Sequence, residues 1–370
     1  MKKVLLVGDS PIADSPYINN YIEILKRNSI SFDYLFWNRH LDDTDNLPDN
    51  FLPYNHYTDI KYPFWKKIIK IRGFANFANR CMREYSYSFV VVFTIAHAVF
   101  MYATLKKYYK GRFVFDIRDY SPMCGMLPSR LIITKLIDNA ALTVISSEGF
   151  LQWLPKCERF TYVVDHNTTK EKVEAAFSFK ESVISPYQNK QDLKILTIGQ
   201  IAYYNSQVFF IDQLANKKGV TLSFIGSGPA SAPLLQYVKE NVIENVEFKG
   251  RYEKMQEISL VKPFDMINIW LKHDINADSC MANRFYLSVQ QRKPMIVSKN
   301  SFQGLLCEKY GLGVVLDEGD VFVDKFKEWW DTFDAAQYEK GCIEFLHGVY
   351  EDLDKFEKAI VNLFNIKDEK

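Results

Sequence analysis

The sequence predicts an α/β protein made of two domains, each built on a parallel β-sheet. Short apolar runs alternate with longer segments of helical periodicity through residues 1–165, and the same alternation restarts at Leu193. Strands of a parallel sheet are buried on both faces, so they read as continuous apolar runs separated by crossover helices. The length of 370 residues also exceeds the usual size of one compact core.

Ten apolar runs are the expected strands. Those of the first half span residues 3–7, 32–36, 89–93, 113–117 and 142–146. Those of the second half span residues 194–198, 221–225, 246–249, 265–269 and 294–297. Strands that alternate with helical segments in this way are typical of Rossmann-like domains.

The predicted domains follow from this rhythm. The boundaries are 1–166 for an N-terminal Rossmann-like domain, 167–191 for a polar hinge, 192–345 for a C-terminal Rossmann-like domain, and 346–370 for a C-terminal helix. Aromatic residues recur at helical spacing through 321–364, which favours a packing role for that stretch. Packing of the last helix against the N-terminal domain is one arrangement open to it.

Composition excludes several classes of function. Lys and Arg number 46 against 45 Asp and Glu, so no overall field favours nucleic-acid binding. The six cysteines form no C-x-x-C pair and have no His at metal-ligand spacing, which predicts reduced thiols and no metal site. The N-terminus lacks a signal-peptide pattern, and the longest apolar run, 89–95, is far shorter than the ~20 residues of a spanning helix. We expect a cytoplasmic protein.

The most informative segment is the turn Gly226-Ser227-Gly228, between an expected strand and a helix that begins near Pro229. Glycines in such a turn let backbone amides approach a phosphate at a helix N-terminus. The same residues also suit a tight strand-to-helix turn that binds no ligand. Both interpretations stay open at this point.

The segments around this turn form an ordered series, consisting of 226–229 (GSGP), 248–251 (FKGR), 283–286 (NRFY) and 292–297 (RKPMIV). In order and spacing the series resembles the C-terminal domain of family-four-like glycosyltransferases of the two-domain B fold, which act in capsule and O-antigen polysaccharide biosynthesis. Segments 115–119 (FDIRD), 146–150 (SSEGF) and 163–167 (VVDHN) resemble the N-terminal domain of the same family more loosely.

The resemblance implies a fold and a reaction. Two Rossmann-like domains would face each other across a cleft, with a nucleotide-diphosphate sugar bound by the C-terminal domain and a lipid-linked oligosaccharide acceptor by the N-terminal domain. It implies a hexosyl- or related glycosyltransferase that requires no cofactor and no metal, with a retaining or inverting outcome left open. Two other functions also stay open: a non-catalytic B-fold scaffold or sugar-binding partner of another transferase, and a nucleotide-sugar epimerase.

The resemblance also implies a donor site. Its expected residues are Gly199, Gln200, Asn205, Gly226, Ser227, Gly228, Arg251, Asn283, Arg284 and Tyr286. Family members commonly hold the pyrophosphate with an Arg and a Lys where this chain has Gln200 and Asn205, and carry two Glu where it has Ser279 and Leu287. Arg binds a diphosphate through two parallel charge-assisted hydrogen bonds, so Arg284 and Arg251 are the expected replacements. An ordinary salt bridge is the alternative interpretation of Arg284.

Polar residues at the expected carboxyl ends of the first-half strands predict the acceptor site, because open α/β sheets bind ligands at that edge. The acceptor-binding candidates are Asp9, Ser10 and Arg118, and the catalytic candidates are His97, Asp116 and Asp119. A carboxylate or His could deprotonate the acceptor hydroxyl in an inverting transfer. Equally, His97 could be a hydrogen-bonded structural histidine and Asp119 a helix or turn cap.

Residues 61–85 read as a basic amphipathic helix. Seven cations (Lys61, Lys66, Lys67, Lys70, Arg72, Arg80 and Arg83) stand against Glu84, and apolar residues recur at helical spacing at Phe64, Ile68, Ile71, Ala75, Ala78 and Met82. Such a helix suits an anionic membrane surface, with Trp65, Lys66, Lys67 and Lys70 as the contact residues and the protein peripheral on the inner face of the membrane. The alternative is an ordinary helix packed on the N-terminal sheet.

Overall fold

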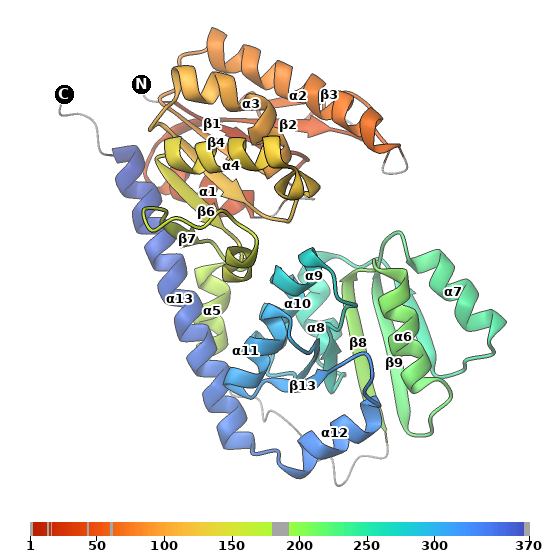
Figure 1. Cartoon of the computed structure of the whole chain (residues 1–370). Helices are drawn as coiled ribbons and strands as arrows, with labels where there is room; N and C mark the ends of the chain where they lie inside the picture. The colour runs from red at the N-terminus through yellow and green to blue at the C-terminus, as the bar shows by residue number, and fades with distance from the viewer. Residues whose placement is uncertain are drawn as a thin grey trace. The chain divides into compact units, whose positions relative to one another are not determined.

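The computed structural model describes residues 3–12, 15, 17–42, 44–59, 62–179 and 192–365. The chain divides into two compact units. The first unit consists of Met1–His166 together with Asp352–Lys370, and the second unit consists of Asn167–Glu351. Figure 1 draws the first unit in red to yellow with the end of the blue C-terminal helix, and the second in green to blue.

The first unit contains a sheet of seven parallel strands in the order β3-β2-β1-β4-β5-β6-β7. Its strands are β1 (Lys3–Val7), β2 (Ser31–Asn38), β3 (Phe51–Asn55), β4 (Phe89–Phe93), β5 (Phe113–Ile117), β6 (Leu142–Ile145) and β7 (Tyr162–Val164). The five predicted strands are confirmed. The two that sequence missed, β3 and β7, are the edge strands, which are only partly buried and therefore lack a continuous apolar run.

Helices cover both faces of this sheet. They are α1 (Ile18–Arg27), α2 (Phe64–Glu84), α3 (Ile95–Tyr108), α4 (Leu127–Asn139), the short 3-10 helices η1 (Pro122–Gly125) and η2 (Glu148–Gln152), and the end of α13 (Ala335–Asn365). Figure 1 shows α2, α3 and α4 side by side as one layer. On the other face, α1 and α13 share a core with β1, in which the rings of Tyr21 and Phe356 meet edge to face with centroids 5.1 Å apart.

The second unit contains six parallel strands in the order β10-β9-β8-β11-β12-β13. They are β8 (Leu193–Gln200), β9 (Val220–Ser227), β10 (Val246–Gly250), β11 (Met266–Asn268), β12 (Met295–Ser298) and β13 (Gly313–Leu316). The helices are α5 (Lys170–Phe177), α6 (Tyr204–Leu214), α7 (Ser231–Glu240), α8 (Glu257–Val261), α9 (Ile275–Ser279), α10 (Asn283–Gln290), α11 (Phe302–Tyr310), α12 (Phe322–Asp331) and most of α13, with the 3-10 turn η4 (Lys254–Gln256). Only the edge strand β13 was not predicted.

Both sheets reverse their strand order once, between β1 and β4 in the first and between β8 and β11 in the second. At such a switch point the loops that leave neighbouring strands diverge, which opens a place for ligands beyond the carboxyl ends. The carboxyl edge of each sheet is therefore where functional side chains are expected.

The chain passes between the units at His166 and Asn167 and again at Glu351 and Asp352, within α13. Residues 180–191 of the predicted hinge lie outside the described residues. All six cysteines are free thiols. None of the helices in the described part of the chain has the length and hydropathy needed to cross a bilayer, and no three potential His, Cys, Asp or Glu ligands gather there into a metal site.

Candidate functional site

Two glycine turns meet at the carboxyl edge of the second sheet. Gly199 at the end of β8 pairs in register with Gly226 at the end of β9. A Cβ on Gly226 would lie 1.9 Å from the carbonyl oxygen of Gly199, and one on Gly228 would lie 2.2 Å from that of Ile201. The close approach of the two loops thus requires both glycines, as the tight-turn interpretation proposed, and it brings two predicted donor segments into contact.

Arg251 joins the same edge from the end of β10. Its Nε donates a hydrogen bond of 2.9 Å to the hydroxyl of Ser227, in the β9 turn, while the side chain stays exposed. The contact fixes one nitrogen of the guanidinium and leaves the others available. The structure therefore places this predicted donor residue beside the glycine turns.

Arg284, in the first turn of α10, is partly buried among neutral groups. Burial lowers the pKa of Arg284, and the ionisable side chains that act on its charge are Cys280, Tyr252 and Tyr203, from the segments after α9, β10 and β8. It forms no ion pair with any carboxylate among the described residues. A guanidinium stays charged, and withdrawing it from water without a counter-ion is costly. The salt-bridge alternative therefore has no support there.

Other predicted donor residues divide between surface and core. Gln200, Asn205 and Asn283 are exposed. Tyr286, by contrast, is buried in the core of the second unit, where its ring packs near that of Phe345. The donor contact of Tyr286 stays a prediction, and its ring lies in the core of the second unit.

The two positions where the resemblance implies Glu are also buried. Ser279 is fully enclosed, and its hydroxyl donates a 2.6 Å hydrogen bond to the carbonyl oxygen of Ile275. Leu287 is an apolar residue of the same core. Neither side chain offers an acceptor at the sheet edge.

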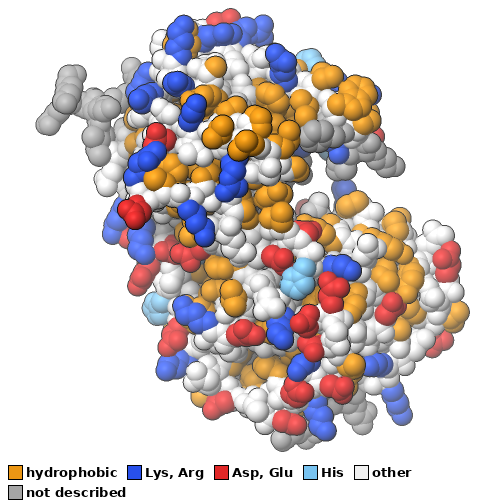
Figure 2. All heavy atoms as spheres, in the orientation of Figure 1, with side chains coloured by type: hydrophobic (Ala, Val, Ile, Leu, Met, Phe, Trp, Pro, Cys, Tyr) orange, Lys and Arg blue, Asp and Glu red, His pale blue; other side chains and the backbone are white. Residues whose placement is uncertain are grey.

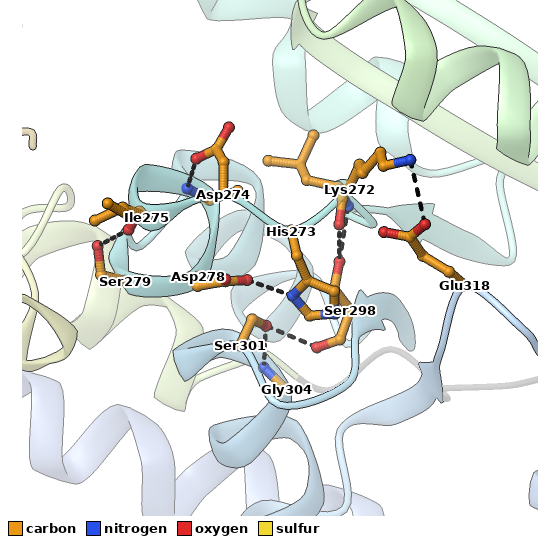
Figure 3. Close-up of polar contacts among 12 residues, drawn as sticks. Lys272, His273, Asp274, Ile275, Asp278, Ser279, Ser298, Ser301, Gly304 and Glu318 are labelled. Atoms are coloured by element: carbon orange, nitrogen blue, oxygen red, sulfur yellow. Dashed lines mark hydrogen bonds and ion pairs between the residues drawn. The ribbon is translucent and has the colours of Figure 1, made fainter. Parts of the chain in front are cut away.

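Sequence reasoning missed a His-Asp pair at this edge. His273 lies in the loop between β11 and α9, and its Nδ1 is 2.6 Å from a carboxylate oxygen of Asp278 (Figure 3). The signal was present, since Lys272, His273 and Asp274 are the first polar residues after an apolar strand run. The carboxyl-end rule applied to the first half of the chain would have selected them.

In the first unit, Asp116 and Arg118 belong to a buried ion network. Nη2 of Arg118 donates to Asp116 at 2.6 Å and to Asp165 at 2.5 Å, and the hydroxyl of Tyr21 donates to Asp116 at 2.6 Å. Burial raises the pKa of Asp116 to about 6, while the adjacent Arg118 opposes the rise. Neither side chain is at the surface. Their predicted catalytic and acceptor-binding roles stay predictions, and in this structure both side chains belong to the buried network.

His97 is also buried. Its Nδ1 lies 3.0 Å from the hydroxyl of Thr94, and its ring packs 4.8 Å from that of Phe74. Burial lowers its pKa to about 4, so the ring is neutral at physiological pH. These contacts fit the structural alternative for His97, and its catalytic role stays a prediction.

Three predicted residues remain near the surface of the first sheet's carboxyl edge. Asp9 follows β1 and pairs with Arg39 at 3.0 Å, with both side chains partly exposed. Ser10 shares a hydrogen bond with the hydroxyl of Ser15. Asp119, two residues beyond β5, is exposed. Asp9 and Asp119 are therefore the predicted carboxylates of this edge that a ligand can reach.

The basic helix α2 packs on its own unit. Ala75, Ala78 and Met82 of the predicted apolar stripe are buried, and α2 lies against α3. This half of the stripe is thus a core contact, as in the alternative of a helix packed on the N-terminal sheet, whereas Ile68 and Ile71 are partly exposed. Lys61 lies outside the described residues, as does the side chain of Phe64.

A different part of α2 is exposed. The first two turns present Trp65 and Ile69, whose side chains are 63% and 60% exposed, with Lys66, Lys67 and Lys70 around them. Leu127 and Leu131 are exposed on α4, in the same helix layer. Figure 2 shows hydrophobic and basic side chains gathered over this face of the first unit.

Comparisons with known proteins match the fold but not the sequence. No protein-family model matches the chain, and no characterised protein matches it in sequence. Solved structures match over nearly the full length. One of them is sucrose-phosphate synthase from Thermosynechococcus elongatus, which is 11% identical in sequence and gives a TM-score of 0.72. The match covers 98% of this chain and 99% of that chain.

Two further solved structures have similar values. The Anabaena protein HepE in complex with UDP has 14% identity, covers 98% of this chain and 99% of its own, and gives a TM-score of 0.67. A glycosyltransferase from Rickettsia africae has 13% identity, covers 99% of this chain and 100% of its own, and gives a TM-score of 0.65. The chain therefore has the glycosyltransferase B fold, with two α/β domains built on parallel sheets.

Proposed function

We propose that the chain is a glycosyltransferase that moves a hexose or a related sugar from a nucleotide-diphosphate sugar to a hydroxyl group. The observation that carries the proposal is Arg284, a partly buried guanidinium with no ion-pair partner among the described carboxylates, surrounded by loops from three strand ends. A diphosphate supplies the counter-charge in a geometry that guanidinium groups bind well. The Anabaena protein of the same fold, solved with UDP and with UDP-glucose, supports this choice of ligand.

In the proposed reaction the second unit binds the donor and the first binds the acceptor. Arg284 and Arg251 balance the charge that develops on the diphosphate as its bond to the anomeric carbon breaks. In an inverting transfer, Asp9 or Asp119 takes the proton of the acceptor hydroxyl. The oxygen of that hydroxyl then attacks the anomeric carbon of the donor sugar. In a retaining transfer the departing diphosphate takes the proton. The proposal requires no metal and no cofactor.

Calorimetry tests the function by measuring the binding of UDP, ADP, GDP and dTDP, and of the glucose conjugate of each nucleotide. We expect one nucleotide to bind and its sugar conjugate to be consumed only when an acceptor is present. Absence of binding at millimolar concentration would instead support the scaffold. Conversion of the donor sugar to an isomer without any acceptor would support the epimerase.

We further propose that the acceptor is a lipid-linked oligosaccharide of surface-polysaccharide assembly and that the first unit reaches it at an anionic membrane surface. The exposed start of α2 supports this, since Trp65 and Ile69 can enter the headgroup region while Lys66, Lys67 and Lys70 bind anionic lipid. This end of the helix follows β3 and so lies at the carboxyl edge of the sheet, the same edge as Asp9.

Replacement of Lys66, Lys67 and Lys70 by Glu is expected to abolish binding to phosphatidylglycerol vesicles. Each basic residue near an anionic surface contributes about 1 kcal/mol, so the triple variant should bind at least ~100-fold more weakly. Sedimentation with vesicles at low and high salt measures this. The matched control replaces Lys106, Lys107 and Lys110, exposed residues near the end of α3, at the opposite edge of the sheet. Equal sedimentation of the triple variant and the wild type, or no wild-type binding at low salt, would contradict the proposal.

A further inference from the structure

We propose that His273, oriented by Asp278, accepts a hydrogen bond from a hydroxyl of the donor sugar. The inference rests on the proposed function and deepens it, because it names a residue that recognises the sugar rather than the nucleotide. Four observations support it: the rigidity of the loop, the tautomer of the imidazole, the place of the loop beside Arg284, and the engagement of Asp274 and Ser279 in other contacts.

The loop that carries His273 is held on both sides by buried hydroxyls. The amide of Leu271 donates to the hydroxyl of Ser298 at 2.8 Å, and the amide of Lys272 donates to the hydroxyl of Ser206 at 2.9 Å. Both serines are buried. The backbone next to His273 is thus fixed to the neighbouring elements β12 and α6, as a residue that recognises a ligand requires.

Asp278 sets the tautomer of His273. An ionised carboxylate only accepts hydrogen bonds, so the proton of the neutral imidazole lies on Nδ1, 2.6 Å from Asp278. The other nitrogen, Nε2, then carries a lone pair. It has no hydrogen-bond partner among the described residues, and the side chain is 34% exposed. The pair therefore presents an unused acceptor at the surface of the second unit.

The same loop borders the proposed donor site. Asn276 donates to the hydroxyl of Tyr203 at 3.4 Å, and Tyr203 and Cys280 are two of the groups around Arg284. The loop from His273 to Cys280 therefore lies next to the guanidinium that we propose binds the diphosphate. A sugar linked to that diphosphate comes within range of this loop.

Other acceptors on this loop are engaged or point elsewhere. Asp274 caps α9 by accepting from the amide of Ala277 at 2.7 Å, and Figure 3 shows its side chain directed away from His273. Ser279 is buried, and the adjacent cation Lys272 pairs with Glu318 at 3.3 Å. Sugar hydroxyls need acceptors as well as donors, and Nε2 of His273 is an acceptor that this loop exposes.

Calorimetry on the full chain tests the assignment by comparing UDP, ADP, GDP and dTDP with their glucose conjugates. We expect His273→Phe to bind the preferred nucleoside diphosphate within about 2-fold of wild type and its sugar conjugate about 10-fold more weakly, the cost of one lost hydrogen bond. His273→Gln, whose amide oxygen can replace Nε2 as acceptor, should stay within about 3-fold for both ligands. His347→Phe, at an exposed histidine of α13, is the matched control.

Asp278 acts as a positioning residue, and Asp278→Asn tests it. An Asn amide can donate to Nδ1, which moves the ring proton to Nε2 and removes the acceptor. We expect the same selective loss for the sugar conjugate, whereas a merely structural defect would weaken both ligands alike. Unchanged affinity of His273→Phe for the conjugate, or an equal loss for both ligands, would overturn the inference. If the wild type binds no nucleotide at all, the proposed function fails and the inference fails with it.

Discussion

Arg284→Ala is expected to lower the affinity for the preferred nucleoside diphosphate by about 30-fold or more, because truncating one partner of a buried, hydrogen-bonded charge pair costs about 2 to 5 kcal/mol. The chain has Gln200 and Asn205 at the two positions where related enzymes are expected to have cations, so no second charge at those places compensates. Isothermal titration calorimetry with UDP, ADP, GDP and dTDP measures the loss.

Two variants make this prediction specific. Arg284→Lys keeps the charge but loses the planar fork, so it should bind between wild type and Arg284→Ala. Arg159→Ala removes an exposed arginine of the first unit and should bind like wild type. Because Arg284 has no carboxylate partner in the described structure, its removal should leave the melting temperature unchanged or raise it. Wild-type affinity in Arg284→Ala, or a fall in its melting temperature, would contradict the assignment.

The central strands of both sheets could be predicted from the sequence because each is buried on two faces. The run at 89–93 became β4 with the same bounds, and that at 113–117 became β5. Of the four edge strands, only β10 was predicted, and the others lack this signal. β3 is partly exposed along its length, and β13 alternates between buried and partly exposed residues, so neither carries the continuous apolar signal of an inner strand.

Side-chain direction explains why the predicted site residues differ in exposure. Arg284 and Tyr286 are two residues apart on one helix, so their side chains point about 200° apart around the axis. One stays at the sheet edge and the other enters the core. Asp116 lies inside β5 and is buried, whereas Asp119 lies beyond the strand and is exposed. A residue near a strand end is predicted to lie at the edge of the sheet. Whether its side chain is exposed there depends on its exact position relative to the last residue of the strand.

The His-Asp pair in the second unit shows a different limit. His273 and Asp278 are five residues apart, and α9 begins between them. No helical or strand period brings such positions together, since neighbours on a helix are three or four residues apart. Their contact depends on the irregular loop before α9. Sequence can identify polar residues after a strand, but it cannot pair them across such a loop.

The second large effect concerns stability. Arg118→Met is expected to destabilise the first unit by about 3 to 5 kcal/mol, the usual cost of removing one partner from a buried ion pair. The variant leaves the carboxylates of Asp116 and Asp165 buried without their cation. For a unit of this size the loss corresponds to a melting temperature about 6 to 20 °C lower. Differential scanning calorimetry separates this transition from that of the second unit.

The destabilisation should depend on pH with a defined sign. Burial already raises the pKa of Asp116 to about 6, and Arg118 restrains that rise, so the pKa increases further in Arg118→Met. A carboxyl whose pKa is higher in the folded than in the unfolded state favours folding at low pH, and this contribution is lost as the pH rises through the folded value. The difference between variant and wild type should therefore be smaller at pH 5 than at pH 8. Arg159→Met, which breaks the exposed pair with Asp138, should show little change at either pH. A deficit in Arg118→Met that is equal at both pH values, or larger at pH 5, would show that the charge of Asp116 does not depend on this guanidinium.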